Sequence, residues 1–443
     1  MLKKIDIGKT KFSDLHQLFN FNSHVEFENK KSRLFPIGNT NMEVPTVAIF
    51  LSSLSAVKEF REELFLTIGV KKIKTANVAV HTYTELEDDS KTNRPDGLIV
   101  ITSGKHEPII EWIGFVEAKV ATKQVDIDQM ERYIKLSRSL GISNIITISN
   151  NLATNPKQNP IADKLKGKVN RFNLYHWSWT YLKVTASRLI KNNVLQDEDH
   201  VYILIELRRY FENHKKLSNY INMGSQWKSV AERINALPLK SSIDNFTLEY
   251  AVNSYLQEEK DVSLQLTDRS NMHVELIHSK DRFSELKKLL NDKKVFISKF
   301  MINGNKNKIF SIEIDFLQLQ IRCSVEVVIK TGKAKSQTSQ LIRMLESDSG
   351  ATDSMLITAK YPYNKIKKRS EETHLSKLFD EKYKKVSEYS VNDKAIGDTV
   401  KSFEIKTRDI INKQFFSAKN FVKKLEDNAE VFLTQVMVNI KDN

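Results

Sequence analysis

RPDGLIVITSGKHEPIIEWIGFVEAKVATKQVDIDQMERY, residues 94–133, contains two apolar runs rich in β-branched residues and then a segment with helical spacing. The runs at 97–104 and 112–120 predict two strands that follow one another closely. Asp126 suits a helix N-cap and Gly141 suits a helix stop, so a helix is predicted over 127–140.

The flanking segments extend this pattern into a sheet. Residues 76–86 alternate enough to form a strand, and the run at 144–149 is typical of a buried strand. The first three strands suit a meander, and the helix then crosses to the next strand, so a mixed α/β sheet flanked by helices is expected. The apolar spacing over 46–68 predicts a preceding helix, and residues 171–182 predict one more strand leading into a helix.

The rest of the chain divides by pattern into further regions. Residues 1–45 are polar and irregular and are expected to form an N-terminal arm, ahead of a domain at 46–195. Residues 196–290 are expected to be a helical region. Strands return at about 295, so a C-terminal α/β domain for recognition or partner binding is predicted at 291–443, with helices closing it near 401–437.

Composition narrows the function class. The 443 residues include 69 Lys and Arg against 55 Asp and Glu, and a net charge of +14 favours a polyanionic partner. Nucleic acid is the first expectation, with an anionic membrane surface or a ribosome as the alternative. The single cysteine, Cys323, excludes an internal disulfide and a cysteine-based metal site. The chain shows neither an apolar run long enough to span a membrane nor a signal-peptide core, which predicts a cytoplasmic protein.

Three side chains on neighbouring predicted strands carry the chemistry. Asp96 stands at the start of one strand, and Glu117 and Lys119 stand on the next, two positions apart and therefore on the same face. Two carboxylates can hold Mg²⁺ or Mn²⁺ through oxygen, with the Ala118 carbonyl as a further ligand. Such a metal lowers the pKa of bound water, while Lys119 can orient or help deprotonate that water, or hold a phosphate. The alternative is a salt-bridged strand pair on a solvated sheet face.

The stretch Pro95-Asp96 followed by Glu117-Ala118-Lys119 resembles the motif of the PD-(D/E)xK nuclease superfamily, whose fold is shared by many restriction enzymes, Holliday-junction resolvases and RecB-type nucleases. The resemblance covers about residues 46–185. It implies a restriction-endonuclease-like sheet and a catalytic site in which Asp96 and Glu117 bind the metal and Lys119 serves the water or the phosphate.

A second element supports the same resemblance. Gln129 and Tyr133 lie four residues apart, so both occupy one face of the predicted helix. They resemble the QxxxY element of the RecB-like branch, which implies that both residues support the site. The family's first helix often adds a metal-site glutamate, for which Glu59, Glu62 and Glu63 are the candidates, and the sequence does not choose among them.

The resemblance implies a Mg²⁺-dependent endonuclease, most simply one that cuts double-stranded DNA in restriction or phage defence. A non-catalytic nucleic-acid-binding or scaffolding subunit with the same fold is the alternative, and an RNA-processing nuclease is a third. A homodimer or a partner subunit is left open. Two basic stretches are candidates for contact with the nucleic-acid backbone, although the second suits a solvated loop equally well: Lys164, Lys166, Lys168 and Arg171, then Lys365, Lys367, Lys368 and Arg369.

Overall fold

The chain forms two compact units, Met1–Asn219 and Tyr220–Asn443. The division lies at 219/220 rather than at the predicted 195/196, because α6 (Glu198–Asn213) packs against α5 (Trp179–Lys191) and α2 (Glu43–Ala56). In the described ranges, no helix is long and apolar enough to cross a membrane. The computed structural model describes residues 4–28, 30–31, 42–86, 93–121, 125–165, 167, 172–214, 216–217, 220–277, 279, 281–345, 355–362, 370–380 and 399–440.

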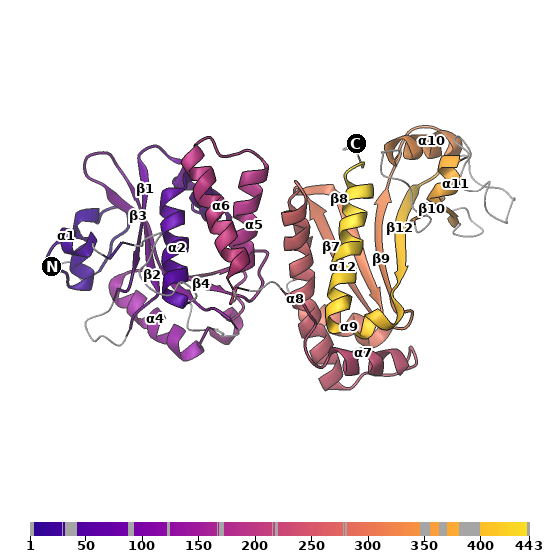
Figure 1. Cartoon of the computed structure of the whole chain (residues 1–443), viewed down its shortest axis with the longest axis horizontal. Coiled ribbons are helices and arrows are strands. Elements are labelled where there is room, and N and C mark those ends of the chain that lie inside the picture. Colours follow the sequence, from indigo (N-terminus) through magenta and orange to yellow (C-terminus); the bar gives the residue numbers. More distant parts are fainter. Residues whose placement is uncertain are drawn as a thin grey trace. The chain divides into compact units, whose positions relative to one another are not determined.

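The first unit is built on a five-stranded mixed sheet with the order β1-β2-β3-β4-β5 (Figure 1). Strands β1 to β3 are antiparallel neighbours, whereas β3, β4 and β5 run parallel. Helix α4 (Ile127–Leu140) makes the crossover, with Asp126 capping its first turn and Gly141 ending it in the left-handed conformation. The predicted meander and crossover are confirmed. The strands are β1 (Val78–Thr84), β2 (Gly97–Ser103), β3 (Ile109–Ala118), β4 (Asn144–Ser149) and β5 (Asn173–Ser178).

Both faces of this sheet are covered, which explains why β2 is continuously apolar from Leu98 to Ile101. Ile99 and Ile101 pack in one core with side chains of the helices α2, α3 (Lys58–Thr67), α5 and α6. Leu98 and Val100 point the other way and pack with the N-terminal segment, including Phe27. The described residues of that segment and of the loops hold the short helices η1 (Phe12–Phe19), α1 (His24–Glu28), η2 (Lys71–Lys74) and η3 (Ala162–Leu165).

The helix predicted over 46–68 is two helices, α2 and α3 (Lys58–Thr67). They are separated at Val57, whose backbone is extended. Helix α2 also begins earlier than predicted, at Glu43, because Pro45 lies in its first turn. A proline is tolerated in a first helical turn, where the missing N–H has no intrahelical acceptor. The last residues assigned to the arm therefore belong to the helix.

The second unit is built on a seven-stranded antiparallel sheet with the order β11-β10-β12-β9-β8-β7-β6. In β8 the side chains of Phe310, Ile312 and Ile314 are buried, while the alternating Ser311 and Glu313 are partly exposed. This alternation is typical of a sheet with one packed face. The strands are β6 (Val274–Ile277), β7 (Val295–Ile302), β8 (Asn305–Asp315), β9 (Gln320–Val327), β10 (Met355–Lys360), β11 (Ser370–His374) and β12 (Ser402–Ile410).

Helices of the second unit cover the packed face, with α8 and α12 lying across it in Figure 1. The mostly helical character predicted from about 197 to 290 is confirmed, apart from the short strand β6 within it. The prediction of helix from 401 is wrong at its start, where β12 pairs with β9 and β10. The alternation of Phe403 and Ile405 with Glu404 supports a strand there. The helices are α7 (Trp227–Ala236), α8 (Asn245–Arg269), α9 (Arg282–Lys293), α10 (Ala334–Leu345), α11 (Leu375–Asp380), η5 (Asn412–Phe416), α12 (Ala418–Phe432) and the π-helical η6 (Leu433–Met437).

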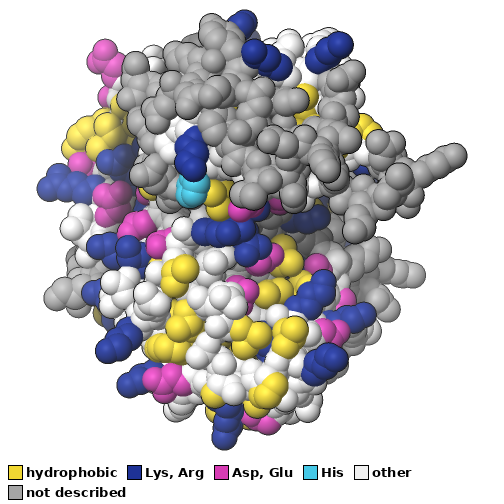
Figure 2. Space-filling view, turned by 90° about the vertical axis from the view of Figure 1, so that its right-hand side faces the viewer, with side chains coloured by type: hydrophobic (Ala, Val, Ile, Leu, Met, Phe, Trp, Pro, Cys, Tyr) yellow, Lys and Arg dark blue, Asp and Glu magenta, His cyan; other side chains and the backbone are white. Residues whose placement is uncertain are grey.

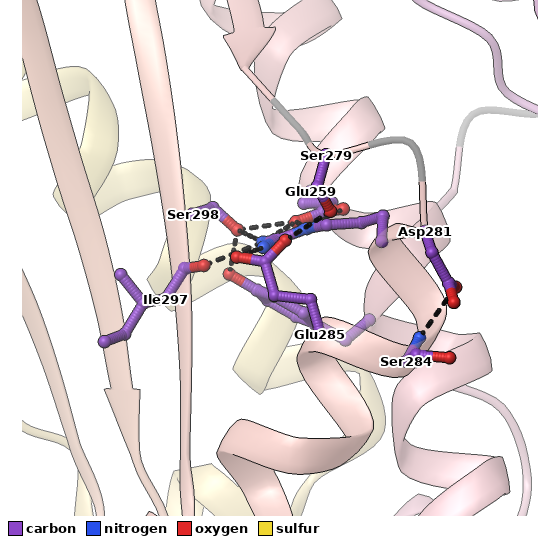
Figure 3. Close-up of polar contacts among 9 residues, drawn as sticks. Glu259, Ser279, Asp281, Ser284, Glu285, Ile297 and Ser298 are labelled. Atoms are coloured by element: carbon purple, nitrogen blue, oxygen red, sulfur yellow. Dashed lines mark hydrogen bonds and ion pairs between the residues drawn. The ribbon is translucent and has the colours of Figure 1, made fainter.

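A buried ion pair joins α8, α9 and β7 (Figure 3). Arg282 donates from Nη2 to Glu259 Oε2 at 2.7 Å and to the Ile297 carbonyl at 2.7 Å. Ser298 Oγ donates to the same Glu259 oxygen at 2.6 Å, and the Tyr255 hydroxyl lies 2.8 Å from Ser298 Oγ. Arg282 Nε also donates to Glu259 Oε1 at 3.1 Å, so both carboxylate oxygens of Glu259 are hydrogen-bonded, as a buried charge requires. The cluster is a structural one.

Candidate functional site

The pairing of β2 with β3 brings Asp96 next to Glu117. Gly97 lies opposite Val116 in the strand register, so Asp96 at the start of β2 lies beside the end of β3. The backbone N–H of Ala118 donates to Asp96 Oδ2 at 2.8 Å. This hydrogen bond holds the Asp96 carboxylate against the chain segment that carries Glu117.

Lys119 completes the group. Its ammonium forms an ion pair with Glu117 and lies 3.3 Å from Glu43 Oε1. The side chain of Glu117 is 1% exposed and that of Lys119 is 12% exposed. The structure therefore brings together the three residues singled out in the sequence, Asp96, Glu117 and Lys119.

Glu43 is the acidic residue of the first helix that reaches this group. It lies in the first turn of α2, and its side chain is 21% exposed. The sequence offered one signal for it, a glutamate two residues before Pro45, but residues 1–45 were assigned to the arm. The three glutamates considered instead are bound elsewhere: Glu59 by His200, Glu62 by Lys58 and Glu63 by Arg188.

Burial and mutual repulsion act on the two central carboxyl groups. Burial raises the pKa of Asp96, and the Ala118 N–H and the Lys119 charge oppose that rise only in part. Burial also raises the pKa of Glu117, and the nearby Asp96 charge raises it further. For Lys119, burial alone would lower the pKa, but Glu117, Asp96 and Glu43 together hold the pKa above its ordinary value.

The donor set fits a hard divalent cation. Glu117 Oε2 and Glu43 Oε2 are buried without a hydrogen-bond partner among the residues that the structure describes. Carboxylate oxygens are the ligands that Mg²⁺ prefers, and a cation would relieve the repulsion that raises the carboxyl pKa values. Within the same residues, no three acidic, histidine or cysteine side chains form a ready-made metal cage. The Lys119 ammonium instead neutralises Glu117 and Glu43.

Gln129 and Tyr133 lie on one face of α4 and connect that helix to the site. Gln129 Nε2 donates to the Tyr133 hydroxyl at 3.0 Å, and this hydroxyl donates to the Arg94 carbonyl at 2.9 Å. Arg94 is two residues before Asp96. Burial raises the pKa of Tyr133, and the charge of Glu117 adds to the rise. Tyr133 therefore holds the chain that enters the site and lies within the electrostatic reach of Glu117.

The backbone of Lys119 is held from two further elements. Its N–H donates to the Ile148 carbonyl of β4 at 2.7 Å. Its carbonyl accepts from the Trp179 indole N–H at the start of α5, at 2.9 Å. Trp179 is buried, as is Trp177. These contacts hold the backbone of Lys119, the last residue of the Glu117-Ala118-Lys119 motif, in place.

Most of the basic residues proposed to contact nucleic acid lie outside the described residues: Lys166, Lys168, Arg171, Lys365, Lys367, Lys368 and Arg369. Lys164 is described, at the end of η3, and is exposed. On the face shown in Figure 2, Lys and Arg side chains are interspersed with Asp and Glu. That face therefore shows no basic stripe among its described side chains.

In comparisons with known protein families, with characterised proteins and with solved structures, nothing matches this chain.

Proposed function

We propose that the first unit is a metal-dependent nuclease of the PD-(D/E)xK type. The observation that carries the proposal is the convergence of Asp96, Glu117 and Lys119 where the start of β2 lies beside the end of β3. A mixed sheet with helices on both faces is the architecture expected of a restriction-endonuclease-like fold. Glu43 on the preceding helix and the Gln129–Tyr133 pair on the crossover helix add support at the places where that fold is expected to carry them.

Each residue has a role that its surroundings suit. Asp96, Glu117 and Glu43 would hold Mg²⁺ or Mn²⁺, with the Ala118 carbonyl as a further ligand. The metal would supply charge relief on the phosphate and an acidified water. Lys119, held as an ammonium by its acidic neighbours, suits hydrogen bonding to a phosphate oxygen better than proton removal from water. Tyr133 and Gln129 would keep the Arg94–Asp96 segment in place.

One observation favours a second candidate, a non-cutting nucleic-acid-binding subunit with the same fold. Lys119 is already bound by Glu117 and Glu43 and is 12% exposed. Side chains that satisfy one another can persist for stability alone. A subunit of this kind would bind nucleic acid in a salt-sensitive way and would leave it intact.

Cleavage of defined substrates separates the two candidates. Plasmid, linear duplex, single-stranded DNA and RNA are incubated with Mg²⁺ or Mn²⁺, using the wild type, Asp96→Asn and Lys119→Met. Cutting by the wild type that both variants lose supports the nuclease, and the substrate that is cut distinguishes DNA from RNA. Binding without cutting by the wild type supports the second candidate.

The chain offers a matched control on the same strand. Glu111 of β3 forms an ion pair with Lys72, away from the site. Glu111→Gln and Lys72→Met remove a carboxylate and an ammonium from a more exposed pair and are expected to cut as the wild type does. If these controls lose cutting as completely as the site variants, the loss reports general damage and not the proposed chemistry.

A further inference from the structure

The end of the first unit contacts both chain segments that build the candidate site. Residues 214, 216 and 217 are the last described residues before the division at 219/220. His214 bonds to the first turn of α2, which carries Glu43, and Lys216 bonds to the chain just after Lys119. The sequence gave no local signal for either contact, since the bonded residues lie far apart in the chain.

His214 is 4% exposed, and its hydrogen bonds define its tautomer. Its Nδ1 accepts from the Lys216 N–H at 3.1 Å, so the proton lies on Nε2, which donates to Thr46 Oγ1 at 3.2 Å. The Thr46 hydroxyl in turn donates to the Met42 carbonyl at 2.7 Å, and the Tyr210 hydroxyl lies 2.9 Å from Thr46 Oγ1. The His214 ring therefore holds Thr46 in place, and with it the first turn of α2, in which Glu43 directly follows Met42.

Lys216 acts on the other side through its backbone. Its carbonyl accepts from the Ala121 N–H at 2.8 Å and from Asn150 Nδ2 at 2.9 Å. Asn150 Nδ2 also donates to the Ala121 carbonyl at 2.8 Å. Ala121 has a φ of +60°, a left-handed conformation that non-glycine residues rarely adopt and that needs support from its surroundings. Lys216 and Asn150 thus hold the turn that follows Lys119.

We propose that His214 is a positioning residue of the candidate site, which sets the place of Glu43 through Thr46. The proposal rests on the proposed function, because it assigns Glu43 to the metal. It also means that the chain leading into the second unit is part of the structure that keeps the acidic groups together. Removing the Nε2–H donor frees the α2 turn and weakens metal binding, whereas a side chain that keeps a donor at this place preserves it.

The test uses paired substitutions in the full chain. His214→Phe keeps a ring beside Tyr210 and removes both hydrogen bonds, whereas His214→Gln retains an N–H donor. Thr46→Val and Thr46→Ser form a second pair at the other end of the same bond, in case the histidine variants fail to fold. His200→Phe, at the start of α6, is the matched control. The readouts are the Mn²⁺ dissociation constant, measured by electron paramagnetic resonance, and amide hydrogen exchange of residues 42–47 and 119–121.

The expected result is a rise of roughly 10-fold in the Mn²⁺ dissociation constant for His214→Phe and Thr46→Val, with faster exchange in both segments. His214→Gln and Thr46→Ser stay near the wild type, as does His200→Phe. Unchanged exchange or unchanged Mn²⁺ binding in His214→Phe and Thr46→Val overturns the proposal. So does equal loss in the phenylalanine and glutamine variants, because that pattern reports packing alone.

Asp96→Asn distinguishes this failure from failure of the proposed function. If wild-type Mn²⁺ binding is absent or does not depend on Asp96, the metal site itself is refuted, and a positioning role toward it falls with it. If Mn²⁺ binding depends on Asp96 but not on His214, the metal site stands and only the positioning role is refuted.

Discussion

Lys119 Nζ lies 3.3 Å from Glu43 Oε1, although 76 residues separate the two in the chain. The same ammonium pairs with Glu117, so one positive charge serves two carboxylates that a metal would also use. The lysine and the metal are therefore expected to compete for these oxygens.

This competition predicts that Lys119→Met separates metal binding from cutting. Without the ammonium, Glu117 and Glu43 have no cation between them, so Mn²⁺ is expected to bind at least as tightly as in the wild type. Cleavage is expected to fall about 100-fold or more, because the donor to the phosphate is lost. Calorimetric Mn²⁺ titration and plasmid cleavage measure the two effects. Weaker Mn²⁺ binding in Lys119→Met than in Lys72→Met would contradict the competition.

Tyr133 offers a test of how the site is held. Tyr133→Phe removes the hydrogen bond to the Arg94 carbonyl and leaves the ring in its core. Because groups that orient metal ligands typically contribute 10- to 100-fold, cleavage is expected to fall by roughly 10-fold. Tyr175→Phe, on β5 of the same unit, is the control and is expected to cut normally. Cleavage by Tyr133→Phe at the wild-type rate would show that the Tyr133 hydroxyl does not help to hold the site.

The sequence predicted those parts of the fold that have local signals. The helix at 127–140 was found from Asp126 and Gly141, and both residues cap it. Strand β12 was predicted as helix because a short alternating segment next to helical sequence is ambiguous by periodicity. Only its central place between β9 and β10 decides for a strand, and that place depends on pairing with distant segments.

The candidate site shows the same limit. Asp96, Glu117 and Lys119 lie on consecutive strands, so strand alternation and spacing were enough to place them together. Glu43 was missed because residues 1–45 were assigned to the arm, whereas α2 begins at Glu43 with Pro45 in its first turn. His214 was missed because its bond to Thr46 spans 168 residues, and no local pattern marks such a contact.

Burial of Glu258 predicts that the stability of the second unit depends on pH. It is fully buried, and neither of its carboxylate oxygens has a partner in the described part of the chain. Burial raises its pKa well above the ordinary value, and the charges of Asp261 and Glu426 add to the rise. The folded state thus retains a proton that the unfolded state releases. This contribution to stability is complete below the unfolded pKa, near 4.5, and is lost as the pH rises toward the folded pKa.

Glu258→Gln removes this titration at nearly constant size. Relative to the wild type, the variant is expected to gain unfolding free energy as the pH is raised from 5 to 8, by at most roughly 1.4 kcal/mol per pH unit. Urea unfolding at each pH measures the difference, with Glu249→Gln on the partly exposed face of α8 as the control. A difference between Glu258→Gln and the wild type that does not change with pH would show that Glu258 is charged when buried.

The ion pair of Glu259 and Arg282 predicts strong coupling. Glu259→Leu leaves the buried guanidinium of Arg282 with only the more exposed Glu285 as an acidic partner and is expected to lower the unfolding free energy by about 3 kcal/mol. Arg282→Met leaves the buried carboxylate of Glu259 without a cation and is expected to cost a similar amount. The double variant leaves no uncompensated charge and is expected to cost much less than the sum of the single variants. The unfolding free energy of the second unit is measured by urea unfolding, with hydrogen exchange of residues 255–300 as the probe. Additive losses would show that the two charges are independently solvated.

A crystal of the full chain soaked in Mn²⁺ tests the central claim most directly. The account predicts an anomalous scattering peak between the carboxylates of Asp96 and Glu117, with Glu43 oriented toward it and Lys119 displaced from at least one acidic partner. A soaked crystal with no peak at this place, and with Lys119 still bound to Glu117 and Glu43, would contradict it.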